Sequence, residues 1–310
     1  IHGPTASGKT DLAIRLAQEL GGEIINADSM QVYRDLRTLT ARPSDEDLAR
    51  APHHLFGHVD GAVRYNTGAW LKDAVERITQ IKERKHVPIL AGGTGMYFAA
   101  LVNGLSSIPD ISEDNRDKAR KLVWEDRDGA IELLGEVDPD AAARIERADS
   151  QRLGRALEVY FQTGKALSAF QTPKAPALAA GEWLGVSLTP RRETLYARID
   201  ARFETMMETG ADEEVRDLFK RNLPDDLPLM RAHGVPALCA HYRDEMSREE
   251  AISIAQRDTR RYAKRQFTWI ANQFPTWPRI PSEDIKTRCE VIFALYAELE
   301  ASLLKGRDEA

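Results

Sequence analysis

The sequence contains very little cysteine. Only Cys239 and Cys289 are present, fifty positions apart and without a C-x-x-C pair. Neither a zinc site nor a disulfide scaffold is therefore expected. This cysteine content is typical of proteins in a reducing compartment, so we predict a cytoplasmic location.

Long apolar runs and bulk positive charge are also lacking. No run of eighteen or more apolar residues and no signal-type segment occurs, so we expect no membrane partner. The formal net charge is −6, so a nucleic-acid partner would need a local basic patch. The chain does have 310 residues and 42% hydrophobic residues, which suffice for one large or two modest domains.

The most informative pattern lies near the start of the chain. Every fixed position of G-x-x-x-x-G-K-[ST] is matched by Gly3-Pro4-Thr5-Ala6-Ser7-Gly8-Lys9-Thr10. The glycines let backbone N–H groups turn toward an anion, Lys9 adds a positive charge, and Thr10 offers a hydroxyl to Mg²⁺. The pattern predicts a bound diphosphate or nucleoside polyphosphate with Mg²⁺ as cofactor, but it does not decide the reaction.

The periodicity on either side of this loop predicts an α/β fold. A helix over 9–20, a buried strand over 23–27, a helix over 67–84 and a strand over 87–91 alternate, and a strand pattern returns at 183–188. Between 111 and 181 the sequence is helical, charged and poor in strands. We therefore predict a P-loop NTPase-like parallel sheet core (1–110 and 182–310, helical in its C-terminal part) with a small inserted helical domain (111–181).

Two candidate catalytic side chains follow strands of this sheet. Asp28 comes after the second strand and should face the phosphate loop, because ligands gather at the carboxyl ends of parallel strands. We identify Asp28 as a candidate base, although Asp followed by Ser is equally typical of a cap. In Gly92-Gly93-Thr94-Gly95, Thr94 is a candidate for neutralising a leaving phosphate, but such a loop also suits a tight turn.

Three histidines lie close together at His53, His54 and His58. Metal binding is one interpretation. Without helical spacing or partner cysteines and carboxylates, polar or packed loop histidines are favoured.

The clearest basic cluster lies in a long helix predicted over 247–274. Five cations and one acid between Arg257 and Arg265 give a local charge of 5 − 1 = +4, followed by Gln266-Phe267-Thr268-Trp269. Basic side chains beside aromatic ones suit a nucleic-acid backbone and stacked bases. An ordinary surface helix with an aromatic core face remains the alternative, as does a solvated basic face for Arg152 and Arg155.

Several motifs in one order resemble the bacterial tRNA dimethylallyltransferases, also called tRNA isopentenyltransferases, of the IPP transferase family. The resemblance runs from Gly3 to about Ile270. It is carried by the phosphate loop and by Asp28-Ser29-Met30-Gln31-Val32-Tyr33, Thr40-Ala41-Arg42-Pro43, Pro52-His53-His54-Leu55, Gly92-Gly93-Thr94-Gly95, Gln151-Arg152-Leu153-Gly154-Arg155-Ala156-Leu157-Glu158 and Lys264-Arg265-Gln266-Phe267-Thr268-Trp269.

The resemblance implies transfer of a dimethylallyl group from dimethylallyl diphosphate to the exocyclic N6 amine of the adenosine 3′ of the anticodon. The phosphate loop would hold the donor diphosphate, with Lys9, Mg²⁺ near Thr10 and Thr94 stabilising the departing diphosphate. Asp28 would accept a hydrogen bond or proton from the amine. The partners implied are the tRNA anticodon stem-loop and dimethylallyl diphosphate, bound by a monomer whose inserted domain closes over the tRNA.

The resemblance also implies a set of contact residues. Arg231 would help to bind the donor and the tRNA, although Val235 and Pro236 depart from the family pattern that follows it. The other tRNA contacts implied are Asp28, Ser29, Met30, Gln31, Thr94, Arg116, Gln151, Arg152, Leu153, Gly154, Arg155, Lys264, Arg265, Gln266, Phe267, Thr268, Trp269, Ile270 and Ala271.

Three other functions remain compatible with parts of the sequence. A P-loop small-molecule kinase would share the phosphate loop and Mg²⁺, and the 111–181 segment would then be its lid. A nucleotide-dependent RNA-binding module would use the basic helix without catalysis. Adenylate prenyltransferase, which modifies a free nucleotide, is the nearest alternative.

Overall fold

The computed structural model describes residues 1–171 and 175–308 and divides into two compact units. We call residues 1–102 and 177 onward the core unit, and residues 103–176 the inserted unit. The sequence analysis predicts the insert at 111–181, so the observed unit begins and ends earlier in the chain. Positions 172–174 and 309–310 of the predicted domains lie outside the described residues.

The core unit contains a parallel sheet. Strands β2 (His53–His54), β1 (Gly22–Asn26) and β3 (Val87–Ala91) are parallel neighbours in that order, and Ile24 is paired with Ile89. A second parallel pair joins β4 (Ser187–Leu188) to β5 (Arg279–Ile280). His2 forms bridges to both Gly92 and Ser187, so the two pairings continue as one parallel arrangement. The predicted α/β class is confirmed, whereas the strand predicted over 183–188 is only two residues long.

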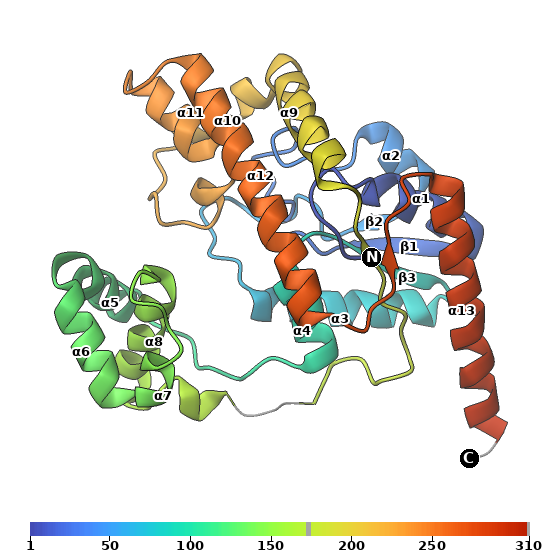
Figure 1. Ribbon diagram of the computed structural model, residues 1–310, viewed down its shortest axis with the longest axis horizontal. Coiled ribbons are helices and arrows are strands. Elements are labelled where there is room, and N and C mark those ends of the chain that lie inside the picture. Colours follow the sequence, from blue (N-terminus) through green and yellow to red (C-terminus); the bar gives the residue numbers. More distant parts are fainter. Residues whose placement is uncertain (172–174, 309–310) are drawn as a thin grey trace. The chain divides into compact units, whose positions relative to one another are not determined.

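Helices cover both faces of this sheet. Neighbouring strand residues point to opposite faces, and Ile24 packs with α1 (Lys9–Leu20) and α13 (Ile285–Asp308) while Ile25 packs with α3 (Thr67–Glu83). In α3 the buried side chains recur on one helical face, beginning with Trp70, whose indole N–H donates to the carbonyl of Asn26 at 2.8 Å. Figure 1 shows α1 and α13 next to each other on the side of the sheet where β1 and β3 are drawn.

The rest of the core unit is mostly helical. Its further helices are α2 (Asp45–Arg50), α4 (Gly95–Asn103), α9 (Arg192–Glu208), α10 (Ala211–Lys220), α11 (Val235–Tyr242) and α12 (Arg248–Gln273). The long helix α12 begins with a capping box, in which Ser247 and Glu250 each bond the other's backbone N–H. Within residues 1–171 and 175–308, no helix is both long and apolar enough to cross a membrane.

The inserted unit is a small bundle of helices. It contains α5 (Glu113–Glu125), α6 (Arg127–Val137), α7 (Pro139–Ala142) and α8 (Ser150–Thr163). Leu134, Leu153 and Leu157 belong to its own hydrophobic core. Asp138 is buried because its carboxylate caps α7 at Ala141 and also accepts the N–H of Ser168 at 2.9 Å. The unit thus has the core and caps of an independent helical bundle.

A buried ion cluster lies at the amino end of the central strand. Glu23 is 3% exposed, and its carboxylate lies 2.6 Å from His54 Nε2 and 2.7 Å from His86 Nδ1. Arg84 donates to both carboxylate oxygens at 2.8–3.0 Å. The hydrogen bonds from Arg84, followed by those from His86 and His54, lower the pKa of Glu23 from 4.5 to about 2, although burial opposes them.

We expect Glu23→Gln to destabilise the protein at pH 7 by about 1.5–3 kcal/mol, the usual range for hydrogen bonds to a charged group. A carboxyl whose pKa is lowered by folding stabilises the fold above its unfolded pKa and loses that effect as the pH falls. The difference in the free energy of unfolding should therefore shrink between pH 4.5 and about 2. Urea unfolding at several pH values measures the free energy of unfolding of the wild type and of Glu23→Gln, and Glu290→Gln serves as a control at an exposed glutamate. A difference between wild type and Glu23→Gln that does not change with pH would contradict the expectation.

Candidate active site

The phosphate loop has the backbone conformation that its glycine pattern predicts. Gly8 precedes α1 with a left-handed φ of 81°, which glycine adopts without steric cost. Lys9 then begins the helix, and its ammonium donates to the carbonyl of Pro4 at 2.7 Å. The loop borders a cavity of about 450 Å³ whose lining includes every residue from Thr5 to Asp11. A helix N-terminus therefore opens into a space suited to an anion.

Three side chains from distant parts of the chain hold this loop. Arg202 of α9 donates to the hydroxyl of Thr5, and the amide of Gln266 on α12 accepts the Thr5 N–H at 3.0 Å. Arg288 of α13 is 3% exposed and donates to the carbonyl of Ser7 at 2.8 Å. The loop is thus fixed by helices α9, α12 and α13 as well as by its own glycines.

Positive charge exceeds negative charge around the cavity. Burial lowers the pKa of Lys9 to about 8, and Arg202 and Arg288 lower it while Asp28 raises it. Burial likewise lowers the pKa of Arg202, against the effect of Asp28. Lys9, Arg198 and Arg202 line the cavity with two carboxylates, Asp11 and Asp28, and Arg288 adds a further positive charge at the Ser7 carbonyl. This excess of positive charge favours an anionic ligand.

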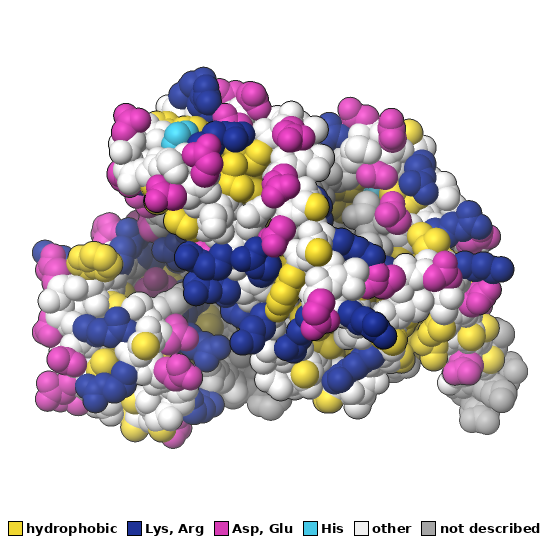
Figure 2. All heavy atoms as spheres, turned by 45° about the horizontal axis from the view of Figure 1, so that its top comes forward, with side chains coloured by type: hydrophobic (Ala, Val, Ile, Leu, Met, Phe, Trp, Pro, Cys, Tyr) yellow, Lys and Arg dark blue, Asp and Glu magenta, His cyan; other side chains and the backbone are white. Residues whose placement is uncertain are grey.

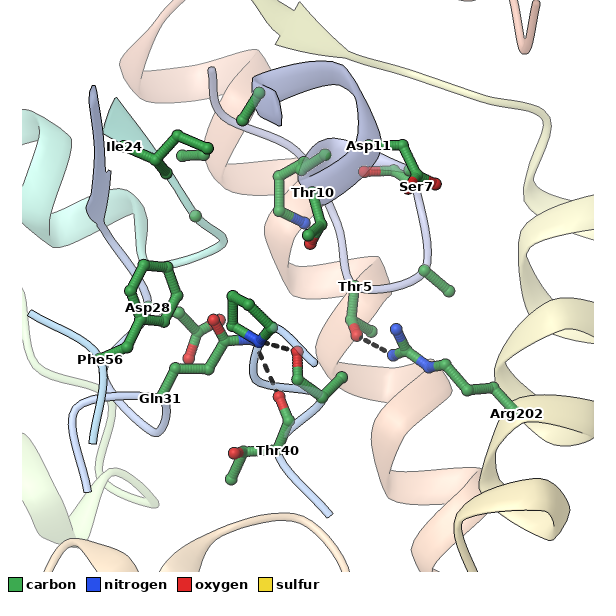
Figure 3. Close-up of a pocket in the computed structure, with 18 of the residues that line it drawn as sticks. Thr5, Ser7, Thr10, Asp11, Ile24, Asp28, Gln31, Thr40, Phe56 and Arg202 are labelled. Carbon is green, nitrogen blue, oxygen red and sulfur yellow. Dashed lines mark hydrogen bonds between the residues drawn. The ribbon is translucent and has the colours of Figure 1, made fainter. Parts of the chain in front are cut away.

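Asp28 lies where both of its predicted roles can be met. Its Oδ1 accepts the N–H of Met30 at 3.0 Å, which is the turn-capping role. The half-buried carboxylate also borders the cavity, where Figure 3 shows Asp28 and Gln31 on one side and Thr5 with Arg202 on the other. A base at this position would face a ligand bound to the loop.

A second, smaller cavity adjoins the first. It has a volume of about 70 Å³ and shares Thr5, Asp28, Thr40 and Arg202 with the phosphate cavity. Its remaining lining is largely apolar and includes Met30, Leu39, Ile199, Phe203, Met206 and Tyr262. Asp28 therefore stands at the junction of a polar and an apolar compartment.

The glycine loop after β3 lies against the Asp28 segment. A Cβ at Gly92 would come within 2.0 Å of the carbonyl oxygen of Ala27, so glycine is required for this approach. The hydroxyl of Thr94 accepts the N–H of Ser29 at 2.9 Å and donates to the Ser29 hydroxyl at 3.2 Å. Thr94 is thus brought next to the Asp28 segment, but it does not line either cavity.

Gln31 is held by backbone on the far side of the phosphate cavity. Its amide donates to the carbonyls of Thr40 and Ala41 at 2.9 and 3.0 Å, the dashed contacts in Figure 3. The segment from Asp28 to Gln31, which the resemblance implies contacts tRNA, therefore borders both cavities, with Met30 in the smaller one and Gln31 in the larger one.

The predicted RNA segment of α12 is divided between two faces. Lys264, Arg265, Thr268 and Ala271 are exposed. Gln266 and Ile270 are 4% and 1% exposed, and Phe267 and Trp269 pack against hydrophobic clusters. The four exposed side chains are open to a macromolecule, whereas Phe267 and Trp269 are half-buried.

Some of the cations on the exposed face of α12 form ion pairs with carboxylates, and others do not. Arg257 and Arg261 lie 3.2 and 3.6 Å from Asp258, and Arg260 pairs with Asp200. Lys264 and Arg265 have no carboxylate partner among the described residues. Figure 2 shows dark blue Lys and Arg side chains gathered on the face that carries α12.

The predicted RNA contacts of the inserted unit also differ in exposure. Gln151 and Arg152 are exposed at the start of α8, whereas Leu153 is 2% exposed and belongs to the core. Arg155 pairs with Glu158 at 3.1 Å. Gly154 and Arg116 are half-buried, and Arg116 lies 3.4 Å from Glu113.

Arg231 does not line the phosphate cavity. It borders a separate cavity of about 490 Å³, together with His233, Asp258, Arg261 and Arg265. The structure thus groups Arg231 with the cationic face of α12 and not with the phosphate loop, because the short helical turn before α11 carries it there.

Arg202 and Arg288 were not identified from the sequence. Arg202 lies in α9 and Arg288 in α13, and no local motif marks either one. Only their contacts with Thr5 and Ser7 distinguish them from surface arginines.

The fold and the site define a P-loop NTPase-like α/β protein with a helical insertion. Residues 31–273 match the family described as IPP transferase. The chain is also 51% identical to the tRNA dimethylallyltransferase of Hyphomonas neptunium over 304 aligned residues. This alignment covers 97% of this chain and 96% of that protein. This protein belongs to the IPP transferase family.

Solved structures show the same likeness. The full-length tRNA isopentenylpyrophosphate transferase of Bacillus halodurans matches with a TM-score of 0.70 and 32% identity, over 98% of this chain and 97% of that one. A eukaryotic dimethylallyltransferase caught acting on tRNA matches with a TM-score of 0.71 and 28% identity, over 87% and 68% of the two chains.

Proposed function

We propose that this chain, as a tRNA dimethylallyltransferase, moves a dimethylallyl group from dimethylallyl diphosphate to N6 of the adenosine 3′-adjacent to the anticodon. The observation that carries the proposal is the position of Asp28, at the junction of a cationic cavity and a small apolar one. A donor with an anionic head and a hydrocarbon tail fits such a pair of compartments.

The donor diphosphate would bind at the phosphate loop. The N–H groups at the start of α1, Lys9 and Arg202 provide donors and positive charge on one side of the cavity. These groups stabilise the charge that develops as the carbon–oxygen bond breaks and diphosphate leaves with the electron pair. Thr94, held by Ser29, orients the Asp28 segment.

The acceptor amine would lie against Asp28. A carboxylate there can take the proton that N6 loses as its nitrogen bonds to the allylic carbon. The adenosine must first leave its stack, which costs a few kcal/mol and less in a loop than in a duplex. A free nucleotide would need none of the exposed cations of α12, so the polymer is the favoured acceptor.

Magnesium fits the donor set of the cavity. Thr10 and Asp28 both line it, and Mg²⁺ prefers oxygen ligands, keeping several waters and substrate phosphates in its shell. The hydroxyl of Thr10 would hold the ion. When bound, Mg²⁺ would add positive charge at the diphosphate. The monomeric state and cytoplasmic location remain predictions.

The acceptor preference tests this function. We expect an anticodon stem-loop with adenosine after the anticodon to accept the prenyl group, and AMP not to. Because each neutralised phosphate releases counterions, stem-loop affinity should fall by about 0.7–0.9 log units per contacted phosphate for each log unit of salt. Incubation with labelled dimethylallyl diphosphate and titrations at several salt concentrations measure both effects.

Paired variants sharpen this test. Lys264→Ala with Arg265→Ala should flatten the salt slope by about 1.4–1.8 if each residue neutralises one phosphate. Lys72→Ala with Lys82→Ala removes two exposed lysines of α3 and should leave the slope unchanged. Efficient prenylation of AMP, or stem-loop binding that ignores salt, would instead favour the free-nucleotide prenyltransferase. Transfer of phosphate from ATP would favour a kinase.

A further inference from the structure

We propose that Gln266 is a positioning residue that fixes the spacing between the phosphate loop and the glycine loop after β3. This inference rests on the proposed binding of diphosphate at the phosphate loop. It differs from the direct tRNA contact that the family resemblance implies for this position.

The amide of Gln266 bridges two backbone groups that are far apart in the chain. Its Oε1 accepts the N–H of Thr5 at 3.0 Å, and its Nε2 donates to the carbonyl of Gly93 at 2.9 Å. A carboxylate cannot donate and an ammonium cannot accept, whereas the amide of glutamine supplies both the acceptor for Thr5 and the donor for Gly93.

Burial rules out a second role for this amide at the surface. Gln266 is 4% exposed and is one of the few buried polar side chains of the described residues. A Cβ at Gly93 would lie 2.2 Å from its Nε2, and one at Gly95 would lie 2.1 Å from the ring of Trp269. Helix α12 is therefore packed directly against the glycine loop, and glycine makes this approach possible.

The bridge matters because the anion site depends on the direction of backbone N–H groups. The loop binds an anion only when those N–H groups converge on it. Thr5 is also held through its side chain, because Arg202 donates a hydrogen bond to the Thr5 hydroxyl. Without Gln266, the Thr5 N–H and the Gly93 carbonyl lose their partner inside the protein, a situation that buried groups rarely tolerate. The loop should then take other conformations that hold diphosphate less well.

The same helix carries the exposed Lys264 and Arg265 on another face. Substitutions on the two faces should therefore have separable effects. Changes to Gln266 should weaken the donor, and changes to Lys264 or Arg265 should weaken the RNA.

The test compares two glutamines of α12. Gln266→Met keeps the size of the side chain but removes both hydrogen bonds, while Gln273→Met changes an exposed glutamine near the end of the same helix. Calorimetric titration with inorganic diphosphate and Mg²⁺ should give a Kd raised about tenfold to a hundredfold for Gln266→Met. Stem-loop affinity should stay within about twofold, and Gln273→Met should match the wild type in both titrations.

Steady-state kinetics provide the second readout. The KM for dimethylallyl diphosphate should rise in Gln266→Met while the KM for the stem-loop does not. Hydrogen exchange should show faster exchange in the phosphate loop, with the thermal unfolding midpoint confirming a folded protein. If Gln266→Met does not fold, Gln266→Glu replaces it in the diphosphate titration. Glutamate keeps an acceptor for the Thr5 N–H but cannot donate to the Gly93 carbonyl, so this variant should also bind diphosphate more weakly than the wild type.

The titrations distinguish a failure of the proposed diphosphate binding from a failure of the positioning role of Gln266. A wild-type protein that binds no diphosphate would overturn the proposed function and this inference together. Wild-type binding with an unchanged diphosphate Kd in the folded Gln266 variant would overturn the positioning role alone. Loss of stem-loop affinity without loss of diphosphate affinity would return Gln266 to the RNA interface.

Discussion

Asp28→Asn is expected to lower turnover by about 10²–10⁴-fold, the usual contribution of general-base catalysis. The amide oxygen of asparagine can still accept the Met30 N–H, so the turn that Asp28 caps should survive. The substitution therefore removes the base without removing the cap. Single-turnover rates with dimethylallyl diphosphate and a stem-loop measure the chemical step, and titration should show donor affinity nearly unchanged.

A matched variant separates the charge of Asp28 from a general effect of losing a carboxylate. Asp244 is exposed and has φ 60°, a conformation that asparagine also tolerates, so Asp244→Asn should leave turnover as in the wild type. Near-normal turnover in Asp28→Asn would reduce Asp28 to its capping role.

Lys9→Ala should weaken dimethylallyl diphosphate binding by about a hundredfold or more, because it removes a partly enclosed charge from a bound anion. Stem-loop affinity should change little, since the exposed cations of α12 do not depend on the phosphate loop. Separate titrations of the two substrates measure both affinities. Equal losses for donor and RNA would contradict this separation.

The pH dependence of donor affinity in the wild type and in Lys9 variants tests the role of Lys9 further. The pKa of Lys9 is lowered to about 8, so the ligand-free protein loses this positive charge as the pH rises through that value. Donor affinity should therefore decline above about pH 8 in the wild type, beyond any change that the donor's own ionisation causes. This extra decline should be absent in Lys9→Ala, and also in Lys9→Arg, whose guanidinium stays charged.

Local patterns allowed much of the fold to be predicted. The phosphate loop is a continuous motif, and α1 and α3 show apolar residues at helical spacing with caps at Gly21 and Asn66. The strand β3 has the predicted bounds, Val87–Ala91. In each case, the signal lies within about one turn or one strand of the chain, where periodicity is informative.

The remainder depends on contacts that no local pattern records. Strands β2 and β5 have two residues each, too few to show alternation, and they exist because β1 and β4 pair with them. Helix α13 was not identified, because its apolar residues run consecutively around Val291 and Ile292 instead of marking one face. Arg202, Gln266 and Arg288 belong to the site only through partners at the start of the chain.

The separation in sequence between the phosphate loop and its supports also bears on how the protein matures. The contacts from Gln266 to Thr5 and from Arg288 to Ser7 span 261 and 281 residues. Ribosomes add about 5–20 residues per second, so the loop leaves the ribosome many seconds before either side chain has been synthesised. A nascent chain would thus carry the whole phosphate motif without the contacts that shape it, and its capacity to hold diphosphate should appear only late in translation.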